Sequence, residues 1–423
     1  MKEPKSTLTS LGVIGALYFS QGIPNGFFRH TVPVIFRENG LSLEQIALFY
    51  PVLFIPWMLK FLWAPLVERF HSINQGKYRS WIIPLQLTIA SVMCSLAFWE
   101  IGGPIGFFII GVLLINIFSS MQDVSIDGHS ITLLKFSERG WGNSVQVGTF
   151  WFGYIIGGGL MLILFSIIGW NNVFFLMAFI YVISMIPILL NKTHKKTNEN
   201  EANNGSNKKW SSIISFFKQP QIVLILCIVS AYRIIEGFIR SILPAMLKDW
   251  GMDFSQIGIT LGIFAPISVL LGAIFAGYFI NRLGRIRSLL VFGLLQIISA
   301  LGYIVLSICS DQPSMSTTIP FIMIDHFISG LVTVALFSSM MDWSRKNQPG
   351  SDYTCMDCMG VFAMMFGAGI SYWIASKWGY SACFIVALPL TFLSIFIVWR
   401  LYNRVEKNKY WKPVDEKSTL EGI

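Results

Sequence analysis

Residues 254–308 indicate the fold class, and they read FSQIGITLGIFAPISVLLGAIFAGYFINRLGRIRSLLVFGLLQIISALGYIVLSI. Two apolar stretches, 254–280 and 288–308, flank the basic segment 281–287. Each is long enough to cross a bilayer, which takes about 20 apolar residues. The pattern recurs along all 423 residues, of which 54% are hydrophobic and 13% charged. A soluble protein of this size could not bury so much apolar surface, so the sequence predicts an all-α membrane protein.

Twelve apolar stretches are predicted to be transmembrane helices. The first six are 8–36, 42–66, 81–101, 105–130, 141–168 and 173–190, and the last six are 220–247, 254–280, 288–308, 319–341, 355–375 and 380–401. The polar interval between them, 191–219, is expected to be a cytoplasmic linker, and its end, Trp210–Phe217, is expected to be a short amphipathic helix on the membrane surface. The predicted domains are an N-terminal six-helix bundle (1–190), the linker (191–219), a C-terminal six-helix bundle (220–402) and a cytoplasmic tail (403–423).

The positions of Lys and Arg predict the orientation of the chain. If the N-terminus is cytoplasmic, the cytoplasmic segments hold 24 of the 31 Lys and Arg, whereas the opposite side holds only Arg37, Lys248 and Lys377. Basic residues next to membrane helices stay on the cytoplasmic side, so both termini are expected there. The net charge of +9 is explained in the same way, and binding to nucleic acid is not expected.

An internal repeat relates the two halves. A shift of 211 residues places Arg29 on Arg240 and the preceding Gly-Phe pair on its copy, and a shift of 219 places Phe118–Asp123 on Phe337–Asp342. Two repeats with the same orientation predict two bundles around an axis along the membrane normal, as in transporters. A single channel subunit would not need such a repeat.

Charged residues inside two spans are the candidates for substrate binding. Arg233, Glu236 and Arg240 lie on one helical face, where Glu236 can contact both arginines and leave a net positive face. Arg29 occupies the position equivalent to Arg240, with His30 beside it. Forked guanidinium groups suit an anionic substrate. The alternatives are that Arg29 and Arg240 snorkel to the outer interface, and that Arg233 and Glu236 form a structural pair.

Further ionisable residues are candidates for proton coupling or gating. Asp123 and Asp127 lie one turn apart, and Lys60 is an expected partner of one of them. A salt bridge at an inner gate, without a proton role, is slightly favoured for these three. Asp325 and His326 are the better candidates for a proton relay, because an imidazole and a carboxylate could titrate there. The alternative is that His326 only hydrogen-bonds its neighbours.

Two short loops at matched positions carry charges that could pair across the bundles. The segment 277–287, GYFINRLGRIR, resembles the loop signature of the major facilitator superfamily, and 66–69, LVER, is a weaker copy. Such contacts would break when the bundles rock, although orientation by positive charge alone is the alternative. The candidate residues of this inter-bundle loop motif are Glu68, Arg69, Asn281, Arg282 and Arg285.

Several functions are excluded by what the sequence lacks. It has no phosphate-binding loop, nucleophile elbow or H-E-x-x-H motif, so neither an ATP-driven pump nor an enzyme is expected. Cys355 and Cys358 form a C-x-x-C without a second pair of ligands nearby, so no metal site is predicted. No cofactor is expected.

Four motifs together resemble the single-polypeptide siderophore permeases for rhizobactin and pyochelin, which are major facilitators. They are 56–65 PWMLKFLWAP, 81–86 WIIPLQ, 122–128 QDVSIDG and 138–148 ERGWGNSVQVG. More distantly, the first motif resembles the muropeptide permeases and acetyl-coenzyme A transporters. The resemblance implies the major facilitator fold, a place in the bacterial inner membrane, and proton-coupled import of an anionic ferric siderophore, such as a hydroxycarboxylate complex, by alternating access.

The sequence leaves other substrates and directions open. A permease for a muropeptide or another anionic metabolite is the main alternative, and a siderophore exporter is a third. The expected partners are the iron-siderophore complex, protons and membrane lipid, and a monomer is expected.

Overall fold

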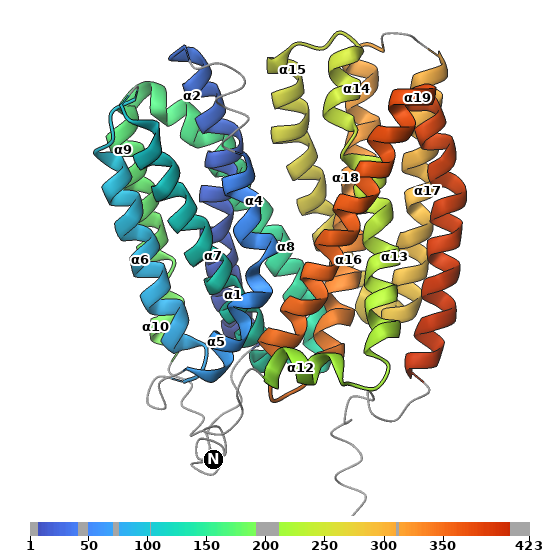
Figure 1. Ribbon diagram of the computed structural model, residues 1–423, viewed down its shortest axis with the longest axis horizontal. Coiled ribbons are helices and arrows are strands. Elements are labelled where there is room, and N and C mark those ends of the chain that lie inside the picture. The colour runs from blue at the N-terminus through green and yellow to red at the C-terminus, as the bar shows by residue number, and fades with distance from the viewer. Residues whose placement is uncertain are drawn as a thin grey trace, which may run out of the picture.

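The computed structural model describes residues 7–40, 50–70, 76–101, 103–191, 211–309 and 313–406. Nearly all of these residues are helical, and none of them forms a β-strand. Long helices run side by side across the molecule (Figure 1). The all-α prediction is therefore confirmed.

The helices of the first half lie together on the left of Figure 1. Their bounds are α1 Thr7–Gly26, the π-helical turn η1 Phe27–Thr31, α2 Val32–Glu38, α4 Tyr50–Met58, η2 Lys60–Leu62, α5 Ala64–Arg69, α6 Arg79–Ala97, α7 Ile105–Leu133, η3 Phe136–Glu138, α8 Arg139–Ile155, the π-helical turn η4 Ile156–Leu160, α9 Met161–Ile183 and α10 Ile186–Leu190. The start of the predicted span 42–66 lies outside the described residues.

The helices of the second half lie on the right of Figure 1. Their bounds are α12 Ser211–Phe217, α13 Ile222–Arg240, α14 Leu243–Asp249, α15 Phe254–Ile259, the π-helical turn η5 Thr260–Phe264, α16 Ala265–Leu283, α17 Arg285–Cys309, α18 Met315–Trp343 and α19 Pro349–Glu406.

Within the described residues, 8 helical segments are long and apolar enough to cross a membrane. Two of them, 136–190 and 349–405, are 55 and 57 residues long, about twice the length of one span. Each breaks at a glycine with positive φ: Gly169 (φ 78°) and Gly379 (φ 80°). A side chain at this φ is disfavoured, so glycine marks the break between two helical arms.

Each half has its own apolar core. One cluster of buried side chains reaches from Ile23 to Tyr181 and another from Val13 to Ile188, both within the first half. A third, from Ile235 to Ala387, lies within the second half. The two halves meet where α8 packs on α16 and α7 packs on α19.

Glycines bring α1 into direct backbone contact with α8 and with the π-helical turn η4 that follows it. A Cβ added at Gly22 would lie 2.1 Å from the carbonyl oxygen of Phe150, and one at Gly157 would lie 1.9 Å from that of Ile23. No side chain fits at either position, so the small residues fix the distance between these helices.

The short helix expected at the end of the linker is present as α12, while Trp210 lies outside the described residues. Phe216 is buried in a fourth apolar cluster, which is built mostly from the second half and includes Ile131 and Val147 of the first, whereas Ile214 and Phe217 are exposed. The helix is thus amphipathic and docked on the second half.

Candidate functional site

Ionisable side chains from both halves form one connected series of ion pairs, called the ion-pair chain below, which begins around Lys60. Its Nζ lies 2.7 Å from Asp123 Oδ2 in α7 and 2.7 Å from Asp357 Oδ2 in α19. Only 3% of Lys60 is exposed. The expected pair of Lys60 and Asp123 is therefore present, and Asp357 extends it into the second half.

The ion-pair chain continues along α13. Arg233 Nη2 lies 3.7 Å from Asp357 Oδ1, and Arg233 Nη1 lies 2.6 Å from Glu236 Oε2. Glu236 Oε1 in turn lies 3.5 Å from Arg240 Nη1 and accepts a hydrogen bond from Ser329 at 3.3 Å. Glu236 thus contacts both arginines, as the helical spacing predicts.

The ion-pair chain ends in α18. Arg240 Nη2 lies 3.2 Å from Oδ1 of Asp325, whose other oxygen accepts a hydrogen bond from Tyr303 at 3.2 Å. His326 Nδ1 lies 3.6 Å from Asp325 and 2.9 Å from the carbonyl oxygen of Ile322. Asp325 is fully buried. Both alternatives for His326 stay open, because its ring contacts the carboxylate as well as its own helix.

The balance of charge differs from the one expected for the isolated span. Four carboxylates (Asp123, Asp357, Glu236 and Asp325) alternate with three basic groups (Lys60, Arg233 and Arg240). The net positive face expected from Arg233, Glu236 and Arg240 is thus absent, because two carboxylates from other helices neutralise the arginines. Pairing offsets the large cost of placing each charge in an apolar environment.

Asp127 has different surroundings from Asp123. It is 1% exposed and accepts hydrogen bonds from the Tyr18 hydroxyl and, at 3.5 Å, from Gln146 Nε2. Its hydrogen-bonding partners are neutral, whereas Asp123 is paired with Lys60. Among the residues that the structure describes, Asp127 therefore has no direct ion pair like the one between Asp123 and Lys60.

Arg29 and Arg240 are not equivalent in their contacts. The Arg29 guanidinium stacks over the Phe54 ring at 4.4 Å, and none of the ion pairs among the described residues includes it. It borders a small pocket that is also lined by Asn25, Asn116 and Ser119. Within the described part of the chain, the buried Nε of Arg29 and Oγ of Ser119 have no hydrogen-bond partner. Polar groups here are available to a ligand.

His30 lies close to the boundary between the halves. Its Nε2 is 2.9 Å from the Tyr154 hydroxyl. A Cβ added at Gly262, in η5 of the second half, would lie 3.5 Å from His30 Nδ1. His30 therefore lies at a point where the two halves approach each other.

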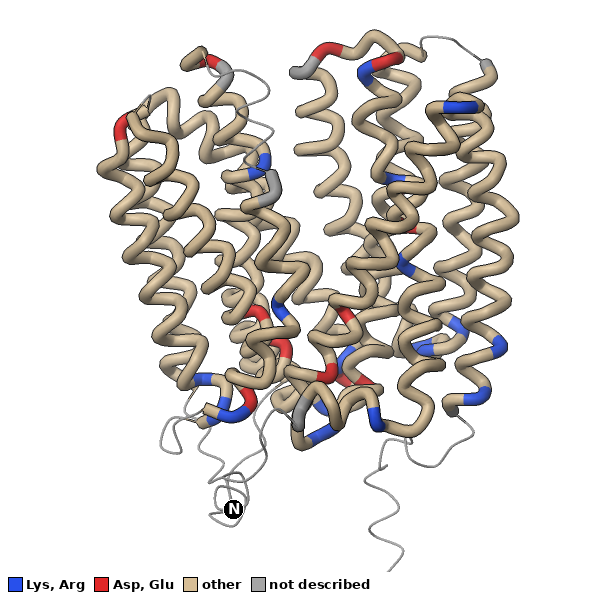
Figure 2. The backbone as a smooth tube through the Cα atoms, in the orientation of Figure 1, with Lys and Arg blue, Asp and Glu red and all other residues tan. Residues whose placement is uncertain are grey.

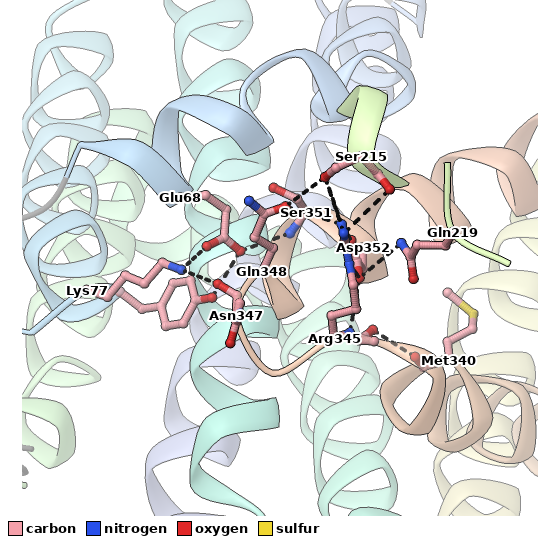
Figure 3. A network of polar contacts seen from close by, with 12 residues as sticks. Glu68, Lys77, Ser215, Gln219, Met340, Arg345, Asn347, Gln348, Ser351 and Asp352 are labelled. Carbon is pink, nitrogen blue, oxygen red and sulfur yellow. Dashed lines mark hydrogen bonds and ion pairs between the residues drawn. The ribbon is translucent and has the colours of Figure 1, made fainter. Parts of the chain in front are cut away.

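Glu68 joins the first half to the start of α19 (Figure 3). It forms an ion pair with Lys77, and its Oε1 accepts hydrogen bonds from the Tyr78 hydroxyl at 3.0 Å and from the Ser351 backbone N–H at 3.1 Å. Lys77 also donates to the carbonyl oxygen of Asn347 at 3.0 Å. Burial, and then the charge of Glu68, raise the pKa of Tyr78, so its hydroxyl stays a donor. A carboxylate at a helix N-terminus is also stabilised by the helix dipole.

The matched loop of the second half contacts the start of α8. Arg285 Nε lies 2.7 Å from Asp342 Oδ2, and Arg285 Nη2 donates to the carbonyl oxygen of Phe136 at 3.0 Å. Asp342 also pairs with Arg139, across the halves, at 2.9 Å. Asn281, with its amide oriented to suit both partners, donates to Ser137 O at 3.2 Å and accepts from Trp141 Nε1 at 3.0 Å.

Two members of the loop motif have other contacts. Arg69 lies over the Phe70 ring at 5.2 Å, and Arg282 over the Tyr278 ring at 4.3 Å. Within the loop motif, the residues that contact the opposite half are thus Glu68, Asn281 and Arg285. They lie at the ends of helices near α12, the edge where Figure 2 shows most Lys and Arg.

A second polar cluster fastens α12 to the same edge (Figure 3). Arg345 forms a forked ion pair with Asp352, with Nε–Oδ2 and Nη2–Oδ1 distances of 2.7 Å. Arg345 Nη1 also donates to Ser215 Oγ of α12 at 3.2 Å. The linker helix is therefore tied to the loop between α18 and α19.

Sequence reasoning missed six charged residues of these networks: Lys77, Arg139, Asp342, Arg345, Asp352 and Asp357. Asp357 carried the clearest signal, because it is a lone carboxylate at the start of an apolar span. Arg139 and Asp342 were present in a motif and in the repeat, but no sequence signal paired them.

The fold and these buried charges define a multi-pass membrane transporter and not an enzyme. The sequence profile of the Major Facilitator Superfamily matches residues 14–323 and 225–421, so the chain belongs to that superfamily. The expected superfamily is confirmed.

The chain resembles two bacterial transporters over most of its length. It is 26% identical over 424 residues to the anhydromuropeptide permease of Escherichia coli K12, which covers 96% of this chain and 82% of the relative. It is 23% identical over 403 residues to the putative transporter AmpG 4 of Rickettsia conorii, with 91% and 94% covered.

A solved structure shares the fold. It is a bacterial homologue of the iron transporter ferroportin in an outward-facing state with soaked iron, with a TM-score of 0.65, 17% identity, and 93% and 99% of the two chains covered. At this identity the likeness shows the fold alone. The comparisons favour the muropeptide alternative over the siderophore interpretation, because the relatives matched by sequence include an anhydromuropeptide permease that covers 96% of this chain.

Proposed function

We propose that the chain is a secondary active transporter that imports a muropeptide across the bacterial inner membrane. The observation that carries the proposal is the similarity to an anhydromuropeptide permease over 96% of the chain. The proposed architecture is twelve transmembrane helices in two six-helix bundles, 1–190 and 220–402, joined by the cytoplasmic linker 191–219 and followed by the tail 403–423.

Two features support the orientation with both termini in the cytoplasm. Helix α1 begins, and helix α19 ends, at the edge where α12 lies (Figure 1). Most Lys and Arg gather at this edge, as expected for a cytoplasmic face (Figure 2). The contacts of Glu68, Arg139 and Arg285 with the opposite half then hold the cytoplasmic side closed. Import requires these contacts to break so that the substrate site can face the cytoplasm.

The chemistry of a muropeptide suits the groups found inside the molecule. It consists of amino sugars linked to a short peptide, which presents amides, hydroxyls and carboxylates. Arg29 offers a forked donor beside Asn25 and Ser119, and these groups suit a carboxylate or an amide. The Asn116 amide, which also lines this small pocket, already bonds Trp57 and Val112. Arg240 is already neutralised by Glu236 and Asp325, so a substrate carboxylate would have to exchange with one of them.

Proton coupling is assigned, within this proposal, to carboxylates in the buried networks. Asp127 accepts hydrogen bonds from neutral groups, and Asp325 lies beside His326 at the end of the chain of ion pairs. Protonation of either carboxylate changes the balance of a buried network and so can alter the preferred conformation. Lys60, which bridges the halves, is assigned a gating role.

Uptake by cells with a permeabilised outer membrane tests the proposal. Radiolabelled anhydromuropeptide and a panel of ferric siderophores are supplied to cells that lack the protein and to cells in which it is restored. Muropeptide accumulation that requires the protein and collapses with an uncoupler is expected. Accumulation of a ferric siderophore without muropeptide uptake would overturn the proposal and favour siderophore import. Protein-dependent loss of preloaded muropeptide would overturn the direction.

A further inference from the structure

A groove lies between α13 and the last arm of α19, outside the ion-pair chain. Its volume is about 420 Å³. Its walls are almost wholly apolar and include Cys227 and Ala231 of α13 and Phe396, Ile397 and Leu401 of α19. Cys227 and Phe396 are exposed, so the groove opens on the outer surface of the helices, where lipid surrounds a membrane protein.

The residues that line the groove reach from Cys227 to Ala231 along α13 and from Phe396 to Leu401 along α19. This corresponds to about 6 to 8 Å at 1.5 Å per residue, so the groove covers part of the roughly 15 Å depth of one leaflet. Two hydrogen bonds join the helices on either side of it: Ser394 donates to the carbonyl oxygen of Ala231, and Gln221 Nε2 donates to that of Arg404 at 3.4 Å, beyond Arg400.

One basic residue lies in the groove near its Arg404 end. Arg400 lines it, is exposed, and forms none of the ion pairs among the described residues. It lies one helical turn from Arg404, on the same face of α19. In the proposed orientation this end faces the cytoplasmic leaflet, which carries anionic lipids.

From this geometry we infer that the groove binds an anionic phospholipid of the cytoplasmic leaflet. Part of one acyl chain occupies the apolar groove, and the headgroup phosphate contacts Arg400. The charge of Arg400 selects an anionic headgroup. A neutral lipid would gain the apolar contact but no ion pair.

Photo-crosslinking of the purified full-length protein in detergent micelles tests this site. The probe is phosphatidylglycerol with a diazirine on one acyl chain, and the labelled peptides are identified by mass spectrometry. Labelling is expected in 222–231 and 394–404. Unlabelled phosphatidylglycerol should compete at about fivefold lower concentration than phosphatidylcholine, the factor expected for one basic residue near a membrane surface. The assignment to the cytoplasmic leaflet rests on the proposed orientation, whereas the labelling result depends neither on transport nor on orientation, so failure of one can be told from failure of the other.

Variants of the groove separate its apolar and ionic parts. Arg400→Gln should remove the preference for phosphatidylglycerol, and Cys227→Trp should fill the groove and abolish its labelling. Ile298→Trp, at an exposed position of α17 that does not line the groove, is the matched control and should change neither. Labelling spread over all exposed helices, or equal competition by the two lipids, would overturn the inference. A crosslinked dimer that protects the groove would instead assign it to a second copy of the chain.

Discussion

Asp357→Asn should shift the protein towards the conformation in which the edge near α12 is open. Asp357 is the member of the second half that pairs with Lys60, at 2.7 Å, so this contact exists only while the halves are together. Asparagine keeps the size of the side chain and removes its charge. Within each half, Lys60 retains Asp123 and Arg233 retains Glu236. The substitution therefore changes the free energy of the open form little.

The magnitude follows from what the closed form loses. Removing one partner of a buried ion pair costs about 3–5 kcal/mol when the other charge is left alone. Here Lys60 keeps one carboxylate at 2.7 Å, so the expected loss is that of one charged hydrogen bond, about 2 kcal/mol. At 1.36 kcal/mol per factor of ten, the ratio of open to closed molecules rises about 30-fold.

The shift can be measured as a distance between spin labels on the two halves. Labels at Lys135→Cys and Lys346→Cys, both exposed, report on this edge in a background whose native cysteines are replaced by alanine. Asp357→Asn should add a population at longer distance. Asp253→Asn is the matched control, because Asp253 caps α15 at the opposite edge and asparagine caps a helix equally well. A distance distribution identical to that of the unaltered background, in folded protein, would refute a gating role for this ion pair.

Three further outcomes are expected. Gly157→Ala should lower the yield and melting temperature of the purified protein, because the added Cβ would lie 1.9 Å from Ile23 O. Gly159→Ala is the control and should leave both unchanged, because its Cβ would meet no atom within 4 Å. Equal effects of the two variants would contradict the packing argument. Arg240→Gln should abolish uptake while immunoblots of membranes show normal protein levels, and normal uptake would remove Arg240 from the substrate site. Glu68→Gln should weaken the closed form by about 1 kcal/mol, seen as increased alkylation of a cysteine placed at Ser351, and unchanged alkylation would exclude Glu68 from the closure.

The sequence alone predicted the helical membrane fold, the superfamily and the contact of Glu236 with two arginines. Apolar length, basic loops and helical spacing are local properties, so they can be read without knowing which helices touch. The pair of Lys60 and Asp123 was also within reach, because few charges lie inside spans and they must find partners. The motif resemblance placed the siderophore first, whereas the sequence relatives favour the muropeptide alternative, since short shared motifs report a common fold more than a common ligand.

Only the tertiary structure decided how the charges combine. Asp357 lies almost 300 residues from Lys60 in the chain, and nothing in either segment names the other as its partner. The same holds for Glu68 and the backbone of Ser351, because any N-terminal helix turn offers such a donor. The net charge around Arg233 and Arg240 depends on carboxylates contributed by α18 and α19, so it cannot be obtained from their own span. Local pattern determines which residues are buried in a helix, whereas the sign and strength of the field that they experience depend on which other helices pack against it.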